Sequence, residues 1–221
     1  MRKPVPILLT SALIVSSAYG GCIAPYFQRT ILTDRAAISL VAADLDGDGK
    51  ADVAGITSTA AFMLRNDGTG KFGAATDIYS GALRGTMIAA DLTGDGHIDL
   101  AFARDGALVV LPGKAGGTFD SPIESPTALK ADAISVAGAN LVVFDAAAAK
   151  LTVFRNNGKG VFTELQTSAI RPDAIAMAAG DLDGDGKQDV VVGYSSTSNT
   201  FDVFYGTSGG TLAAPGRVRD R

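Results

Sequence analysis

Three short segments of the chain place aspartates at fixed spacing around glycine residues. The segments are Asp44–Asp52, Asp91–Asp99 and Asp181–Asp189, and each begins and ends with aspartate and has glycine at its sixth position. When the backbone curls at that glycine, side chains at alternate positions converge on one point and present the hard oxygen ligands that Ca²⁺ prefers. Carboxylates packed this closely without a cation would repel one another. The spacing therefore predicts three calcium-binding loops.

The predicted ligands are the side chains at positions 1, 3, 5 and 9 of each loop and the backbone carbonyl at position 7. In the first loop they are Asp44, Asp46, Asp48, Lys50 and Asp52, in the middle loop Asp91, Thr93, Asp95, His97 and Asp99, and in the last loop Asp181, Asp183, Asp185, Lys187 and Asp189. Threonine at position 3 removes one carboxylate from the middle loop, so we expect that loop to bind Ca²⁺ more weakly.

Plain turns, an EF-hand, a zinc cluster and a catalytic site fit these residues less well than calcium loops do. Asp and Gly also favour plain turns that bind no metal, but such a turn needs only one or two of them. An EF-hand requires flanking helices and Glu at position 12, where this chain has Gly55, Phe102 and Val192. One histidine and one cysteine are too few for a Cys/His zinc cluster and argue against a Ser-His-Asp or Cys-His catalytic site.

The loops belong to a longer repeat. Asp44 and Asp91 are 47 residues apart, and Asp91 and Asp181 are 90 apart, so a unit without the loop is expected near residue 136. The segment 133–144 has the flanking strand pattern there, with a short turn, Gly138-Ala139-Asn140, in place of the acidic loop. A Gly-rich turn before an apolar residue recurs in phase, at Phe72, Phe119, Phe162 and Leu212.

The pattern of each unit predicts four short strands separated by turn residues. In the first unit we expect strands at 38–43, 52–56, 62–66 and 72–79, with a turn at Thr57–Ala60. Four strands in 40 to 50 residues is the spacing of a propeller blade, whereas a β-sandwich needs no sequence repeat. The predicted fold class is all-β, a β-propeller-like array of about four four-stranded blades, with an incomplete propeller as an alternative to a closed one.

The three loops, each followed by an apolar strand and then by a turn such as Asn66-Asp-Gly-Thr-Gly70 or Asn156-Asn-Gly-Lys-Gly160 before Phe, resemble FG-GAP/VCBS repeats. Such repeats occur in integrin α-subunit propellers and in many bacterial surface proteins. The resemblance implies that the calcium loop joins the first and second strands of a blade, and that the third unit holds no metal. Family members commonly have seven blades, while this chain has about four and a stray strand near Phe27. The alternatives are four blades that close tightly, two associated chains (a homo-oligomer), or frayed ends.

The N-terminus predicts export. Arg2 and Lys3 precede an apolar stretch, 5–15, that is too short to span a bilayer, and small residues follow up to Cys22. Cys22 is a predicted lipidation site, as in bacterial lipoproteins, with plain secretion as the alternative. The expected division of the chain is a signal peptide at 1–21, a segment with the stray strand at 22–35, the repeat domain at 36–216 and a tail at 217–221, with repeat units at 36–82, 83–128, 129–171 and 172–216.

Composition limits the partners. The net charge of −4 and a pI near 4.9 leave no basic stripe for a nucleic acid, and a membrane is expected only through the lipid anchor. We predict a non-enzymatic recognition or adhesion module, secreted or on the cell surface or outer membrane, with a glycan or protein ligand held by the loops opposite the calcium loops: Thr57–Ala60, Asp105–Gly106 and 195–199. The alternatives are an enzyme acting on polysaccharide and a truncated fragment without activity of its own.

Overall fold

The computed structural model describes residue 33, residues 35–195 and residues 201–217. Within these residues the chain is all-β, and its strands form four four-stranded antiparallel sheets and one small hairpin. The expectations for the signal peptide, for Cys22 and for a strand near Phe27 concern residues outside the described part. Among the described residues, no helix has the length and apolar character needed to span a membrane.

Each sheet is one blade, and its strands follow one another outward in chain order. Blade 1 contains β1 (Ser39–Ala43), β2 (Asp52–Ile56), β3 (Ala60–Leu64) and β4 (Thr76–Ser80), and blade 2 contains β5 (Leu83–Ala90), β6 (Asp99–Arg104), β7 (Ala107–Leu111) and β10 (Ile123–Pro126). Blade 3 contains β11 (Ala133–Ala137), β12 (Asn140–Asp145), β13 (Lys150–Asn156) and β14 (Phe162–Ala169), and blade 4 contains β15 (Ala174–Gly180), β16 (Asp189–Tyr194), β17 (Phe201–Phe204) and β18 (Gly216–Arg217). The extra hairpin, β8 (Gly113–Lys114) and β9 (Thr118–Phe119), projects from blade 2.

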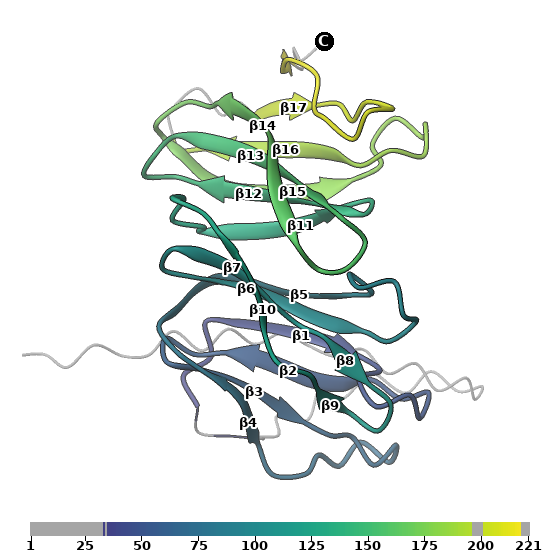
Figure 1. The fold of residues 1–221 in the computed structure, drawn as a ribbon. Helices are drawn as coiled ribbons and strands as arrows, with labels where there is room; N and C mark the ends of the chain where they lie inside the picture. The colour runs from purple at the N-terminus through teal and green to yellow at the C-terminus, as the bar shows by residue number, and fades with distance from the viewer. Residues whose placement is uncertain (1–32, 34, 196–200, 218–221) are drawn as a thin grey trace, which may run out of the picture.

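The blades stack face to face into an open array, with blade 1 and blade 4 at opposite ends (Figure 1). The first strands of successive blades, β1, β5, β11 and β15, contact one another in that order. The propeller-like arrangement of four four-stranded blades is thus confirmed, and the array does not close on itself.

The core lies between the blades. Because side chains alternate along a strand, a middle strand of an inner blade contributes side chains to the cores on both of its faces. Leu100 and Phe102 of β6 pack against blade 1, while Ala101 and Ala103 of the same strand pack against blade 3. A third cluster joins blade 3 to blade 4. The middle strands of the inner blades therefore have apolar side chains on both faces, as expected for a sheet that is covered on both sides.

Two predicted strands of the first unit are shifted. The strand expected at 62–66 is Ala60–Leu64, because the Thr57 hydroxyl accepts the backbone N–H groups of Thr59 and Ala60 and closes a turn shorter than predicted. The strand expected at 72–79 is Thr76–Ser80. Phe72 makes only an isolated bridge to Asn66, and continuous pairing with β3 begins at Thr76.

Candidate metal centres

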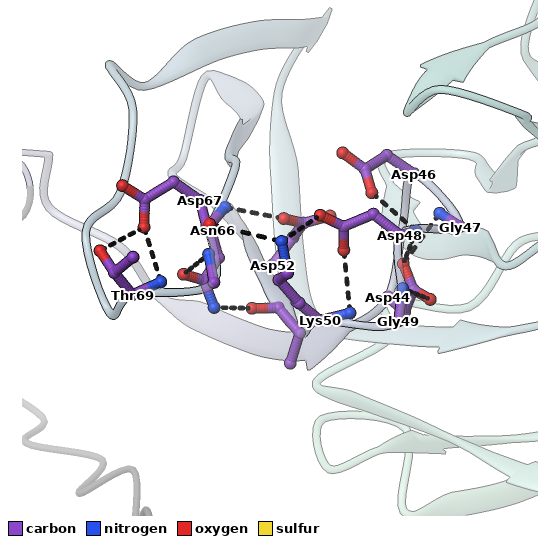
Figure 2. A network of polar contacts seen from close by, with 12 residues as sticks. Asp44, Asp46, Gly47, Asp48, Gly49, Lys50, Asp52, Asn66, Asp67 and Thr69 are labelled. Carbon is purple, nitrogen blue, oxygen red and sulfur yellow. Dashed lines mark hydrogen bonds and ion pairs between the residues drawn. The ribbon is translucent and has the colours of Figure 1, made fainter.

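The first Asp loop joins β1 to β2 and brings three carboxylates together. Each of Asp44, Asp46 and Asp48 offers an oxygen, and these oxygens all lie within 4.8 Å of one another. The loop curls around Asp44, whose carboxylate accepts the N–H groups of Gly47 and Gly49 at 2.8 Å each (Figure 2). Both glycines have φ of 82°, in the left-handed region that glycine adopts freely. The backbone thus curls in the way that the spacing predicted.

The last Asp loop, between β15 and β16, forms the second cluster. Here the grouped side chains are Asp181, Asp183 and Asp189. Asp185 instead forms an ion pair with the Lys187 ammonium group, which holds the pKa of the Asp185 carboxyl below its usual value. The first loop has a looser version of this pairing, with 3.3 Å between Lys50 Nζ and the Asp48 carboxylate.

The middle loop, between β5 and β6, has the same backbone but no such cluster among the described residues. Asp91 accepts N–H groups from Gly94 and Gly96, and Asp95 accepts that of His97. The His97 side chain is exposed. Thr93 stands at position 3, and its hydroxyl oxygen is buried with no hydrogen-bond partner. The expectation of weaker calcium binding here stays a prediction.

Position 9 has a structural function that the sequence reasoning missed. Asp52, Asp99 and Asp189 are at most 1% exposed. Asp52 accepts the N–H groups of Leu45 at 3.2 Å and Asn66 at 2.8 Å, and so ties the Asp loop to the turn after β3. Asp99 and Asp189 do the same through Leu92 with Gly113, and Leu182 with Gly206.

Blade 3 shows that this tie does not depend on the Asp loop. Asn140, the first residue of β12, accepts the N–H of Asn156 at 3.3 Å, the bond that Asp52 makes to Asn66 in blade 1. The Gly138-Ala139 turn replaces the whole acidic segment. The sequence signal was present, since Asn140 follows its turn in the register of Asp52, Asp99 and Asp189.

The residues present fit a bound Ca²⁺. The first and last loops offer clustered carboxylate oxygens, which match a hard cation with several oxygen ligands. A carboxylate has about four lone-pair sites, so Asp44, Asp181 and Asp189 can accept backbone N–H groups and still face a metal. The carbonyls of Lys50, His97 and Lys187 and the side chains of Asp52 and Asp99 stay predicted ligands.

Each Asp loop that has a following blade is also covered by that blade. The Gly116 N–H of blade 2 donates to the Asp46 carbonyl of blade 1 at 3.0 Å, and the Gly160 N–H of blade 3 donates to the Leu92 carbonyl of blade 2 at 3.0 Å. At the third junction the Asn140 amide donates to the Gly210 carbonyl of blade 4 at 3.2 Å. The Gly-rich turn of one blade therefore rests on the preceding blade at every internal junction.

A second candidate site lies at the other end of the strands. A hollow of about 390 Å³ between blades 1 and 2 is lined by Tyr79, Gly81, Ala82, Arg104, Asp105 and Glu124. Arg104 binds both carboxylate oxygens of Glu124, and the Tyr79 hydroxyl lies 3.3 Å from Glu124 Oε1. The Arg104 hydrogen bonds lower the pKa of Glu124, and burial raises that of Tyr79. Of the predicted ligand loops, Asp105 lies in this hollow, and 196–199 are outside the described residues.

A stack of four-stranded blades with Asp loops at one end defines a repeat protein of the β-propeller class. Within that class the chain belongs to the FG-GAP repeat family. The FG-GAP-like repeat matches residues 44–102 and 138–192, and the FG-GAP repeat matches residues 174–213. The family resemblance seen in the sequence is thereby confirmed.

A solved structure shares this fold. It is described as the structural basis of specific recognition of non-reducing terminal N-acetylglucosamine by an Agrocybe aegerita lectin, and it superposes with a TM-score of 0.61 at 23% sequence identity. The match covers 80% of this chain and 50% of the lectin chain, so this chain spans about half of that protein. Comparison with curated protein sequences gives no significant match.

Proposed function

We propose that this chain is an exported, calcium-binding recognition or adhesion module whose ligand is a glycan or a protein. The observation that carries the proposal is that the two ends of the blades hold different groups of residues. One end holds the acidic loops, and the other holds the hollow with a fixed set of hydrogen-bonding groups. FG-GAP repeats and a lectin that shares the fold support recognition rather than catalysis, and fold likeness alone does not decide the ligand.

Calcium is proposed to brace the scaffold. Asp44, Asp46 and Asp48 would hold one ion and Asp181, Asp183 and Asp189 another, each closing a loop that its own blade also ties through position 9. Export, and lipidation of Cys22, belong to the same proposal. Extracellular calcium is abundant enough to fill sites with dissociation constants of about 10⁻⁴–10⁻³ M.

The hollow at Tyr79 is the proposed ligand contact, with a glycan as the favoured ligand. The Arg104–Glu124 pair offers charged donors and acceptors at fixed positions, and Tyr79 is held in place by an edge-on contact with Phe102 at 5.1 Å between ring centroids. Ligand sites commonly combine an aromatic wall with a few placed polar groups. Groups that are already ordered lose little freedom when a ligand binds.

The test is a glycan array probed with the calcium-loaded full chain, with a binding screen against extracellular proteins beside it. For a bound ligand, we expect Glu124→Gln and Arg104→Ala each to weaken binding about tenfold or more. The matched control is Lys114→Ala, which removes one member of the exposed Lys114–Asp120 ion pair near the Asp loops. No ligand in either screen contradicts the recognition function, and equal losses in all three variants contradict the placement of the site.

A further inference from the structure

Blade 4 has an open face that resembles the faces joined inside the array. Position 2 of each Asp loop is leucine, and its exposure depends on whether a blade follows. Leu45 and Leu92 are 3% and 2% exposed because blades 2 and 3 cover them, whereas Leu182 is 54% exposed. Phe201 of β17 is 43% exposed, while Leu108, at the same place in blade 2, is 2% exposed.

At the other end of the array, the outward face of blade 1 is open along β1 and the Gly-rich turn, although Phe62 and Leu64 of β3 on this face are 0% and 1% exposed. Ala42 is exposed, whereas Ala89 and Ala179, at the same place in blades 2 and 4, pack against the preceding blade. The Gly-rich turn of blade 1 is free as well. A Cβ on Gly117 or Gly160 would contact the preceding blade, while a Cβ on Gly70 would meet nothing within 4 Å.

The two faces carry the two halves of the junction that the array makes twice, where an Asp loop of one blade meets the Gly-rich turn of the next. Blade 4 offers an uncovered loop leucine, and blade 1 offers an uncovered turn glycine. Figure 1 shows these blades at opposite ends of the stack, so one chain cannot join them in this arrangement. Part of the blade 1 face is already covered, since the Arg35 guanidinium lies over the Phe62 ring at 5.2 Å. Ala42 and Gly70 lie nearer the Asp loop and stay exposed.

We propose that blade 4 of one copy docks on blade 1 of a second copy of this chain. In this joint Leu182 is buried beneath the turn Asn66–Gly70 of the second copy, as Leu92 is buried beneath the turn that contains Gly160. The joint uses different surfaces on the two copies, so it is heterologous, and two copies that make it twice close into a ring. Such a ring has eight blades, at the upper end of the usual range of four to eight. The lectin that shares the fold has a chain of which this one spans half.

The experiment measures the mass of the full chain by light scattering over a concentration series with calcium present. We expect a multiple of the chain mass. Leu182→Lys on blade 4 and Ala42→Lys on blade 1 should each weaken association at least about tenfold, because each places a charge in the joint. Both positions are exposed in the single chain, so both variants should fold.

Val161→Lys is the matched control, since Val161 is 38% exposed and Lys71 already occupies the same place in blade 1. It should associate like the unmodified chain. Mixing the Leu182→Lys and Ala42→Lys variants should restore pairs with one intact joint. A single-chain mass for the unmodified protein overturns the proposal. Association that neither variant weakens also overturns it, because contact then runs through another part of the chain.

Discussion

Blades 1 and 3 have the same four-stranded sheet but different connections between their first two strands. Blade 1 has an eight-residue connection, 44–51, in which three carboxylates meet, whereas blade 3 turns through Gly138 and Ala139 alone. Both keep a polar side chain at the start of the second strand, Asp52 or Asn140, which accepts an N–H from the turn after the third strand. The comparison separates two functions within one motif: the side chain at position 9 holds the blade together, and the residues before it form the carboxylate cluster.

The largest effect on stability is expected at Asp52, whose buried carboxylate joins the Asp loop to the turn after β3. Asp52→Ala leaves two N–H groups without their acceptor, and at about 1–3 kcal/mol for each unpaired group the free energy of unfolding should fall by about 2–6 kcal/mol. Asp52→Asn places in blade 1 the residue type that blade 3 has at position 140, and it should lower the free energy of unfolding by less than Asp52→Ala does. Urea denaturation in chelator measures both without any metal contribution. Equal losses for the two variants would contradict a hydrogen-bonding function for this residue.

Calcium removal should have the next largest effect. Calcium at ten times the dissociation constant stabilises the folded state by about 1.4 kcal/mol per site, so two occupied loops give about 3 kcal/mol. Calorimetry should find two stronger sites and one weaker site, with Mg²⁺ a poor competitor for these many-oxygen loops. Asp48→Ala should remove one of the stronger sites. A melting temperature that chelator leaves unchanged would contradict calcium bracing.

Blade 3 supplies the metal-independent counterpart. Asn140→Ala removes its bond to Asn156 and its bond to Gly210 of blade 4, which should lower the free energy of unfolding by about 1–2 kcal/mol. The loss should be the same in calcium and in chelator, because no acidic loop precedes this residue. A loss that appears only in calcium would tie blade 3 to the metal sites and break the comparison.

The smallest effect on stability is expected in the middle loop. Thr93→Asp gives this loop the carboxylate found at position 3 in the other two, and it replaces a buried hydroxyl that has no partner. The weak site should then become similar to the strong ones in calorimetry, a gain of about 1 kcal/mol at saturating calcium. Thr93→Ser, which adds no carboxylate, is the control. An unchanged third site would show that more than position 3 separates the loops.

Much of the architecture could be predicted because the repeat signals its own period. The phase of Asp44, Asp91 and Asp181 located all four blades, including the one without a loop. Strand ends were less predictable at Phe72, where an apolar residue after a Gly-rich turn forms only a bridge, because local pattern does not determine where pairing ends.

The candidate site was predictable only in part. The convergence of Asp44, Asp46 and Asp48 follows from local curl and could be predicted. The pairing of Asp185 with Lys187, the ties made by Asp52 and the hollow at Tyr79 depend on side-chain rotamers and on segments distant in sequence. A nine-residue pattern does not contain that information.

The Asn140 turn has a consequence for how such chains diversify. A blade that keeps one amide or carboxylate at the start of its second strand retains its place in the stack after losing the whole acidic segment. Blade number and the number of acidic loops are therefore separate variables, and a unit without the loop keeps its contacts with both neighbours. The number of acidic loops can then change one blade at a time, while the surface at the far end of the strands is preserved.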